Sequence, residues 1–178
     1  SLARGPGLTS RAIHLATSRP DAMYEDLLFL LTSLDGVAQS PKYHPEGDAL
    51  FHSLQVFDLA LADDAPPPLL AAALFHDVGK ADAGRDHDVV GAGYLVDLVP
   101  DETCWLVAHH LDLLRSARRT RSRLRGTPRG RNLELLRRYD LGGRSPYARV
   151  RSPEEAVSIT LEALEDAGVR VGQNPTEA

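Results

Sequence analysis

The sequence predicts an all-helical bundle, and three observations support this prediction. Valine, isoleucine and threonine are sparse, whereas alanine and leucine occupy most apolar positions, which favours helices over strands. Apolar residues recur at the three- and four-residue spacing of a helix face. Aspartate or serine caps and glycine or proline stops mark where one helix ends and the next begins.

The first two helices follow from such signals. Asp21 can cap a helix that runs through a leucine-rich stretch and stops at Gly36. Residues 40–47 contain two prolines and a glycine, so this segment is predicted to be a loop. Asp48 then caps a second helix that reaches about Ala62.

Three further helices are predicted in the middle of the chain. A run of prolines leads into a third helix over residues 68–78, because proline is tolerated in the first turn of a helix. A fourth helix covers residues 86–98, and its small residues at 91–93 indicate close packing against a neighbour. A fifth helix begins near Pro100 and continues through two adjacent histidines.

Two more helices are predicted toward the C-terminus. The first covers residues 132–139 and ends close to Asp140. Ser152 and Glu155 form a capping box with proline between them, so the last helix covers residues 153–167.

The length of 178 residues fits one domain over residues 1–178, with helices in 8–36 and 153–167 packing on a central part. Cys104 is the only cysteine, which excludes an internal disulfide framework and a cysteine-rich zinc finger. We therefore expect a reducing, cytoplasmic location. No apolar run reaches the ~18 residues of a membrane span, and no signal-peptide pattern is evident, so no membrane association is expected.

Charge is distributed unevenly along the chain. The net charge is −5, yet residues 115–138 contain ten arginines and a single acid, Glu134. A local contact with a polyanion such as RNA is one interpretation, since guanidinium groups bind phosphate bidentately. A solvated, partly disordered loop is the alternative, and the lack of interleaved aromatics argues against a platform for base stacking. The candidate substrate-binding residues of this segment are Arg118, Arg119 and Arg121.

The third predicted helix ends in a polar doublet. His76 and Asp77 follow an apolar run, and burying such a pair costs several kcal/mol unless it is hydrogen-bonded or holds a metal. His52 shares the apolar face of the second helix with Val56 and Leu59. Two inward histidines on consecutive helices can meet inside a bundle, which is a usual place for metal sites.

A metal site with these ligands favours certain ions. A single histidine of this kind is more often a core or surface side chain, so the prediction depends on the set. Imidazole together with carboxylate suits Mn, Fe, Co, Ni or Zn, whereas Mg is less favoured by so many nitrogen ligands. We expect one or two divalent ions, and Asp77 could bridge them.

The pattern resembles the HD phosphohydrolase superfamily, whose enzymes carry such a His-Asp doublet. The resemblance covers about residues 40–150, from His52 through the doublet to Asp140. Residues 43–48 and 140–144 are further similar to the HD domain attached to bacterial tRNA nucleotidyltransferases. No nucleotidyltransferase catalytic head is recognised in the sequence, so the resemblance does not imply polymerase activity.

The resemblance implies a set of metal ligands. The positions that match the primary metal site are His52, His76, Asp77 and Asp140. The positions that match a second ion, with the doublet aspartate bridging, are His87, His109 and His110. Neighbours on a helix lie about 100° apart, so the sequence leaves open which of the adjacent pair faces inward.

The chemistry implied is phosphoester hydrolysis. Metal ions activate water and polarise a phosphoryl oxygen. Besides Asp77, the candidate catalytic residues are Lys80 and Arg144, which could neutralise or clamp phosphate, and His44, which could donate a proton or have a purely structural role.

The sequence therefore predicts a metal-dependent phosphohydrolase. Its expected substrates are 2′,3′-cyclic, 2′- or 3′-phosphates of nucleotides or RNA ends. One alternative is a nucleotidase or nucleoside triphosphate phosphohydrolase that acts on free nucleotides. Others are a non-catalytic module that binds RNA or a partner protein, and a di-iron oxygenase of the same fold. The sequence does not define the oligomeric state.

Overall fold

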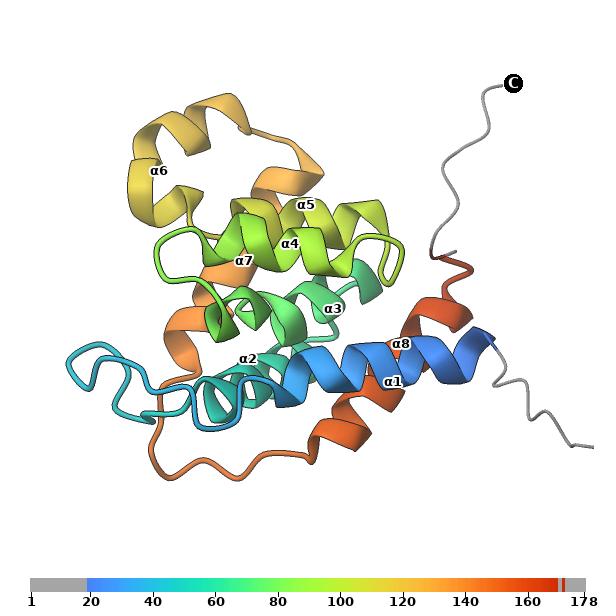
Figure 1. Cartoon of the computed structure of the whole chain (residues 1–178). Coiled ribbons are helices and arrows are strands. Elements are labelled where there is room, and N and C mark those ends of the chain that lie inside the picture. Colours follow the sequence, from blue (N-terminus) through green and yellow to red (C-terminus); the bar gives the residue numbers. More distant parts are fainter. Residues whose placement is uncertain (1–18, 170, 172–178) are drawn as a thin grey trace, which may run out of the picture.

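The predicted all-helical architecture is confirmed. The computed structural model describes residues 19–169 and 171, and within them the chain forms eight α-helices and one short 3₁₀ helix (Figure 1). These elements are α1 (Arg19–Thr32), α2 (Ala49–Ala62), α3 (Pro67–Phe75), η1 (Val78–Ala81), α4 (His87–Leu95), α5 (Asp101–His109), α6 (Asp112–Arg123), α7 (Pro128–Gly142) and α8 (Pro153–Asp166). The part of the first predicted helical segment before residue 19 lies outside the described residues.

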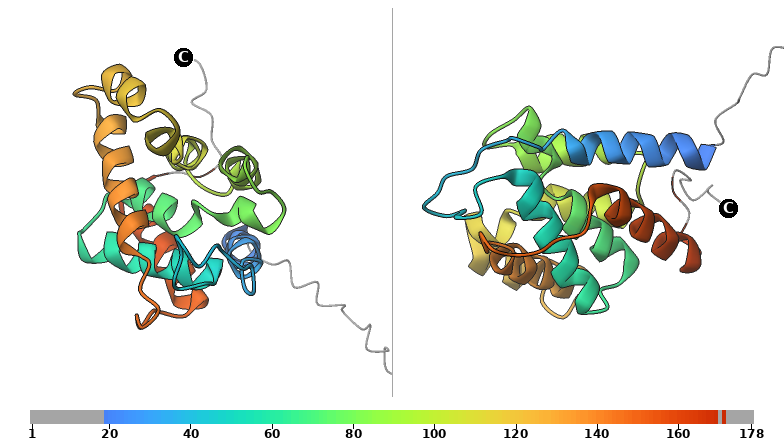
Figure 2. Two further views of the ribbon diagram at one scale, coloured as in Figure 1. Left: turned by 90° about the vertical axis from the view of Figure 1, so that its left-hand side faces the viewer. Right: turned by 90° about the horizontal axis from the view of Figure 1, so that it is seen from below.

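Helix α3 forms the centre of the bundle. Every residue from Leu69 to Phe75 is buried, and a helix that is apolar all round must be surrounded by others. It contacts α2, α5, α7 and α8. Helices α1 and α8 pack together on one side of the bundle, whereas α6 and the start of α7 lie on the opposite side (Figures 1 and 2). Among the described residues, no helix combines the length and apolar character that crossing a membrane requires.

Local capping signals predicted two helix starts correctly. The Asp48 carboxylate accepts a hydrogen bond from the Phe51 backbone N–H at 2.9 Å, which starts α2. The capping box is present at the start of α8, where the Ser152 hydroxyl accepts from the Glu155 N–H at 3.2 Å and the Glu155 carboxylate accepts from the Ser152 N–H.

Two helices in the middle of the chain end earlier in the sequence than predicted. Helix α3 ends at Phe75 and not at residue 78, because the chain tightens into the 3₁₀ turn η1 directly after Asp77. Helix α4 ends at Leu95, since Val96 is extended and Asp97 has a φ of 64°. The first correction places the doublet, His76 and Asp77, directly after the end of α3.

The arginine-rich segment is helical. Helix α6 occupies residues 112–123, with a kink at Ser116, so the interpretation of this part as a partly disordered loop is wrong, although its arginines are exposed to solvent as that interpretation expected. A turn that contains Gly126, with a φ of 73°, separates α6 from α7. Pro128 starts α7 instead of breaking it, and the Thr127 hydroxyl caps this helix through a 3.0 Å bond from the Gly130 N–H.

Candidate metal centre

Six polar side chains from five parts of the chain meet inside the bundle. All are buried, although they lie among apolar neighbours. Their potential ligand atoms form two groups, each with its members within 4.8 Å of one another. The first group is His52, His76 and Asp140, and the second is Asp77, His87 and His110.

Asp77 lies between the two groups. Its Oδ2 atom is 3.3 Å from Nε2 of His76 and 3.9 Å from Nε2 of His52. Its Oδ1 atom is 3.2 Å from Nε2 of His87 and 3.6 Å from Nε2 of His110. Each carboxylate oxygen therefore faces one group, which is the arrangement of a ligand that bridges two ions.

Backbone carbonyls orient the four imidazole rings. Each ring donates its Nδ1–H to a carbonyl at 2.7–3.0 Å, and these pairs are His52 to Gly143, His76 to Ala73, His87 to Gly84 and His110 to Val107. This leaves every Nε2 atom pointing inward, where that of His52 lies 3.0 Å from Oδ1 of Asp140, its partner in the first ligand group. The Nε2 atoms of His76, His87 and His110 are buried without a hydrogen-bond partner. Buried polar atoms are almost always satisfied, so this donor set fits a divalent cation.

The electrostatics also favour bound positive charge. Burial would raise the pKa of Asp77, yet the nearby His76 and Lys80 hold it well below its ordinary value. Burial likewise opposes ionisation of Asp140, whose pKa is nevertheless lowered by a hydrogen bond from His52. Burial alone would lower the pKa of His52 and His87, but their carboxylate partners raise it. The interior therefore holds two carboxylates that attract cations.

The two adjacent histidines have different environments. His110 is buried in the second ligand group, whereas His109 stacks on Trp105 with ring centroids 4.3 Å apart. The Nδ1 atom of His109 is paired with Asp112 at 2.9 Å. The turn of about 100° between neighbouring helical residues directs the two side chains to different sides of α5.

This difference predicts unequal effects of two matched substitutions. His110→Ala is expected to weaken metal binding more than about tenfold at the second group, since even groups that only orient a ligand contribute 10–100-fold. His109→Ala is expected to leave metal stoichiometry unchanged. Titration calorimetry with Mn²⁺ would measure both, and equal losses in the two variants would contradict the assignment of His110.

A pocket of about 620 Å³ opens beside the metal centre. Three cationic side chains line it, namely Lys80, Arg137 and Arg144, and His44 and His87 also reach it. The Lys80 Nζ donates to Asp77 at 2.7 Å and to Gln39 at 2.6 Å. A cationic pocket beside buried metal ligands suits an anionic substrate.

Backbone and carboxylate contacts fix the two arginines of this pocket. The Arg144 Nη1 donates to the Tyr43 carbonyl at 2.9 Å, and its Nη2 lies 3.7 Å from Oδ1 of Asp140. Arg137 donates to Oδ2 of the same aspartate at 3.1 Å. Both guanidinium groups therefore reach the rim of the metal centre.

The three arginines expected to bind substrate lie elsewhere. Arg118 and Arg119 are exposed on α6, and Arg121 pairs with Glu134 of α7 at 2.6 Å. None of the three lines the pocket beside the metal centre, where Leu114 is the only lining residue from α6. The structure therefore separates them from the candidate metal ligands.

Sequence reasoning missed two residues of the centre. The Glu46 side chain is fully buried, and its Oε1 lies 2.8 Å from Nδ1 of His52 and 2.9 Å from Nδ1 of His44. Its position in a proline- and glycine-containing loop concealed this role, although a carboxylate that orients a metal-binding histidine is a common arrangement. Arg137 was missed as well, and its spacing three residues before Asp140 was the available signal.

Comparisons with known proteins agree with this arrangement. A family model described as HD domain matches residues 50–156. The chain is 53% identical to the multifunctional CCA protein of Halorhodospira halophila over 55 residues, which cover 31% of this chain and 13% of that protein. It is 46% identical to the multifunctional CCA protein of Ralstonia nicotianae over 63 residues, which cover 34% and 15%. It is 39% identical to the multifunctional CCA protein of Herminiimonas arsenicoxydans over 79 residues, which cover 44% of this chain and 19% of that protein. The matched part of the chain thus spans less than a fifth of these relatives.

Proposed function

The chain belongs to the HD domain family of metal-dependent phosphohydrolases, and we propose that it hydrolyses 2′,3′-cyclic, 2′- or 3′-phosphates of nucleotides or RNA ends. The observation that supports this most is the bridging position of Asp77 between two groups of buried histidines. The partial similarity to multifunctional CCA proteins, together with the resemblance of residues 43–48 and 140–144 to the HD domain of tRNA nucleotidyltransferases, favours substrates at RNA ends. Arginines within residues 115–138 provide cationic surface for such a substrate.

The proposed ligands follow from the two groups. One divalent ion would be held by His52, His76, Asp77 and Asp140, and a second by Asp77, His87 and His110. Nitrogen-rich sites of this kind suit Mn, Ni, Co, Fe or Zn, and Mg is less favoured. Bound ions supply Lewis acidity toward a phosphoryl oxygen and activate water as the nucleophile.

Side chains around the pocket would bind the phosphate and move a proton. Lys80, Arg137 and Arg144 are proposed to hold its non-bridging oxygens, because all three line the same pocket. Burial lowers the pKa of His44, although its bond to Glu46 opposes this. The Nδ1 atom of His44 is engaged by Glu46, so Nε2 is the ring atom left to exchange a proton with the leaving oxygen.

A substrate panel tests this proposal. The chain would be stripped with EDTA, reloaded with Mn²⁺, Ni²⁺, Co²⁺ or Mg²⁺, and incubated with 2′,3′-cyclic, 2′-, 3′- and 5′-phosphates and nucleoside triphosphates. We expect release of phosphate, or opening of the cyclic ester, only after reloading and mainly with the first three substrates. Turnover dominated by triphosphates or 5′-phosphates would favour a free-nucleotide enzyme. Uniform inactivity would contradict the proposal.

A further inference from the structure

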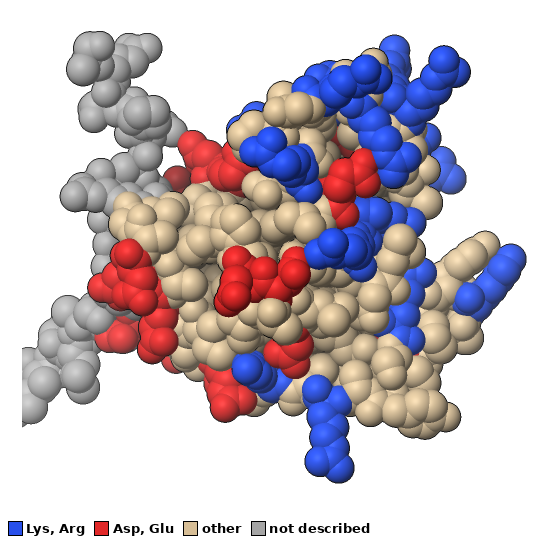
Figure 3. All heavy atoms as spheres, turned by 180° about the vertical axis from the view of Figure 1, so that it is seen from behind, with Lys and Arg blue, Asp and Glu red and all other residues tan. Residues whose placement is uncertain are grey.

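Cationic side chains are concentrated on one half of the molecule. Blue atoms gather over the α6–α7 side in Figure 3, where the basic residues of both helices are all arginines, whereas aspartate and glutamate predominate toward the opposite side. The surface formed by Arg118, Arg119, Arg121, Arg125, Arg131 and Arg138 is here named the arginine face. All six residues are exposed, so the face is accessible to a large anion.

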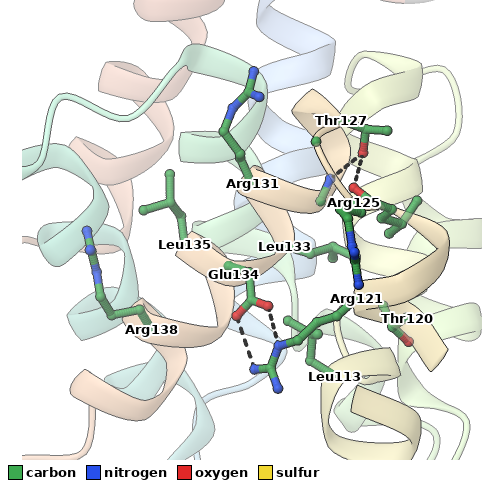
Figure 4. Close-up of a pocket in the computed structure, with 13 residues that line it drawn as sticks. Leu113, Thr120, Arg121, Arg125, Thr127, Arg131, Leu133, Glu134, Leu135 and Arg138 are labelled. Carbon is green, nitrogen blue, oxygen red and sulfur yellow. Dashed lines mark hydrogen bonds and ion pairs between the residues drawn. The ribbon is translucent and has the colours of Figure 1, made fainter. Parts of the chain in front are cut away.

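A hollow of about 620 Å³ lies within this face, between α6 and α7 (Figure 4). Leucine side chains contribute apolar surface to it, including Leu113, Leu124 and Leu133. Arginines line its rim, and the ion pair between Arg121 and Glu134 connects the two helices across it. The hollow is therefore amphipathic, because both leucine side chains and guanidinium groups line it.

Several of these arginines have no partner among the described residues. Arg121 pairs with Glu134, and Arg138 pairs with Asp63 at 2.7 Å. No acceptor is found within the described part of the chain for Arg118, Arg119, Arg125 or Arg131. Their charge is therefore available to an external anion.

The hollow is distinct from the pocket beside the metal centre. Leu113 and Arg138 line the hollow, whereas their chain neighbours Leu114 and Arg137 line the metal pocket. Adjacent helical residues point about 100° apart, so α6 and α7 separate the two spaces. A ligand in the hollow would not touch the metal ligands.

We infer that the arginine face is a second binding site, for a single-stranded segment of an RNA whose phosphorylated end is hydrolysed at the metal centre. The choice of RNA rests on the proposed function. Of the four unpaired arginines, Arg118 and Arg119 lie on α6, whereas Arg125 lies in the turn after α6 and Arg131 on α7. The unpaired charge therefore extends over both helices and the turn between them, as an extended anion requires. A base or ribose fits over the leucines of the hollow, and guanidinium groups bind successive phosphates.

The outer side of α6 favours RNA over an acidic helix. A second hollow there is lined by Arg118, Arg119 and Arg123 together with small residues only. An acidic amphipathic helix requires a continuous apolar groove, whereas here the guanidinium groups continue beyond the leucines. Repeating charge without a matching apolar stripe is the complement of a phosphate backbone.

Binding of a 5′-fluorescein-labelled 12-nucleotide single-stranded RNA, followed by fluorescence anisotropy at several salt concentrations, tests the inference. We expect the double variant Arg125→Gln/Arg131→Gln to bind at least about tenfold more weakly. The slope of log Kd against log salt should become shallower by about 1.4, which corresponds to two lost phosphate contacts on a single strand. Arg149→Gln, which removes an exposed arginine outside the face, is the matched control and should not change binding beyond its general charge effect.

Further measurements separate the possible failures. Absence of RNA binding by the wild-type chain, equal weakening by Arg149→Gln, or equally tight binding of a polyglutamate peptide would overturn the second site. If 2′,3′-cyclic AMP were still hydrolysed in that case, the proposed function would stand. RNA binding that depends on the two arginines, without turnover in the substrate panel, would retain the site and contradict the hydrolytic proposal. Unchanged thermal unfolding would show that the double variant is folded.

Discussion

Replacing Asp77 with asparagine is expected to remove bound metal and phosphohydrolase activity together, with helical content retained. Asparagine keeps the size of the side chain but removes the negative charge, and only the carboxylate can give an anionic oxygen to each ligand group. Metal affinity should fall more than about 100-fold, beyond the 10–100-fold effect of groups that merely orient ligands. Elemental analysis, turnover of 2′,3′-cyclic AMP and circular dichroism would measure the three quantities.

The matched control for this experiment is Asp64→Asn. Asp64 is exposed in a turn with a φ of 51°, a backbone conformation that asparagine tolerates well. The Asp64→Asn variant should keep full metal content and activity. An Asp77→Asn variant that retains both bound metal and turnover would disprove the bridging role, and one that loses its helices would be retested by metal titration of Asp77→Glu.

Gly79→Ala is expected to destabilise the fold strongly, because it forces apart η1 and α4, two elements next to the metal centre. A Cβ atom at Gly79 would overlap the carbonyl oxygen of His87 and lie 2.7 Å from the backbone nitrogen of Gly91. Backbone atoms cannot give way as a flexible side chain can, so η1 and α4 must move apart. We expect a destabilisation of about 3 kcal/mol, at the upper end of overpacking effects. The melting temperature should fall by roughly 6–12 °C for a domain of this size.

The opposite result is expected for Gly93→Ala in the same helix. Nothing lies within 4 Å of a Cβ atom at Gly93, and alanine is favoured over glycine inside a helix by about 0.5–1 kcal/mol. Thermal unfolding of the two variants would therefore move in opposite directions. Equal stability of Gly79→Ala and wild type would show that η1 and α4 are not in close contact. The prediction of close packing at residues 91–93 holds at Gly91 and not at Gly93.

Helix α6 was not predicted from the sequence. Arginine and serine make up most of its sequence, and only Leu113 and Thr120 are buried on it, so few apolar residues mark it as a helix. What stabilises the helix comes from outside it, since Arg115 donates to the buried Asp88 of α4 at 2.6 Å and Arg121 pairs across to α7. Tertiary contacts of this kind routinely override the intrinsic helix propensity of a segment.

The sequence by itself determined the helical class, the caps at Asp48 and Ser152, and the expectation that His52 and the doublet face a common interior. Each of these features depends on residues within one or two turns of the same helix. Over that distance, spacing along the chain determines which side chains share a helix face. Tertiary structure alone decided that His110 and not His109 joins the centre, that Glu46 orients His52, and that the arginine face lies apart from the metal pocket. His52 and Asp140 are 88 residues apart in sequence yet 3.0 Å apart in space. Such distances depend on how whole helices pack, which no local pattern contains.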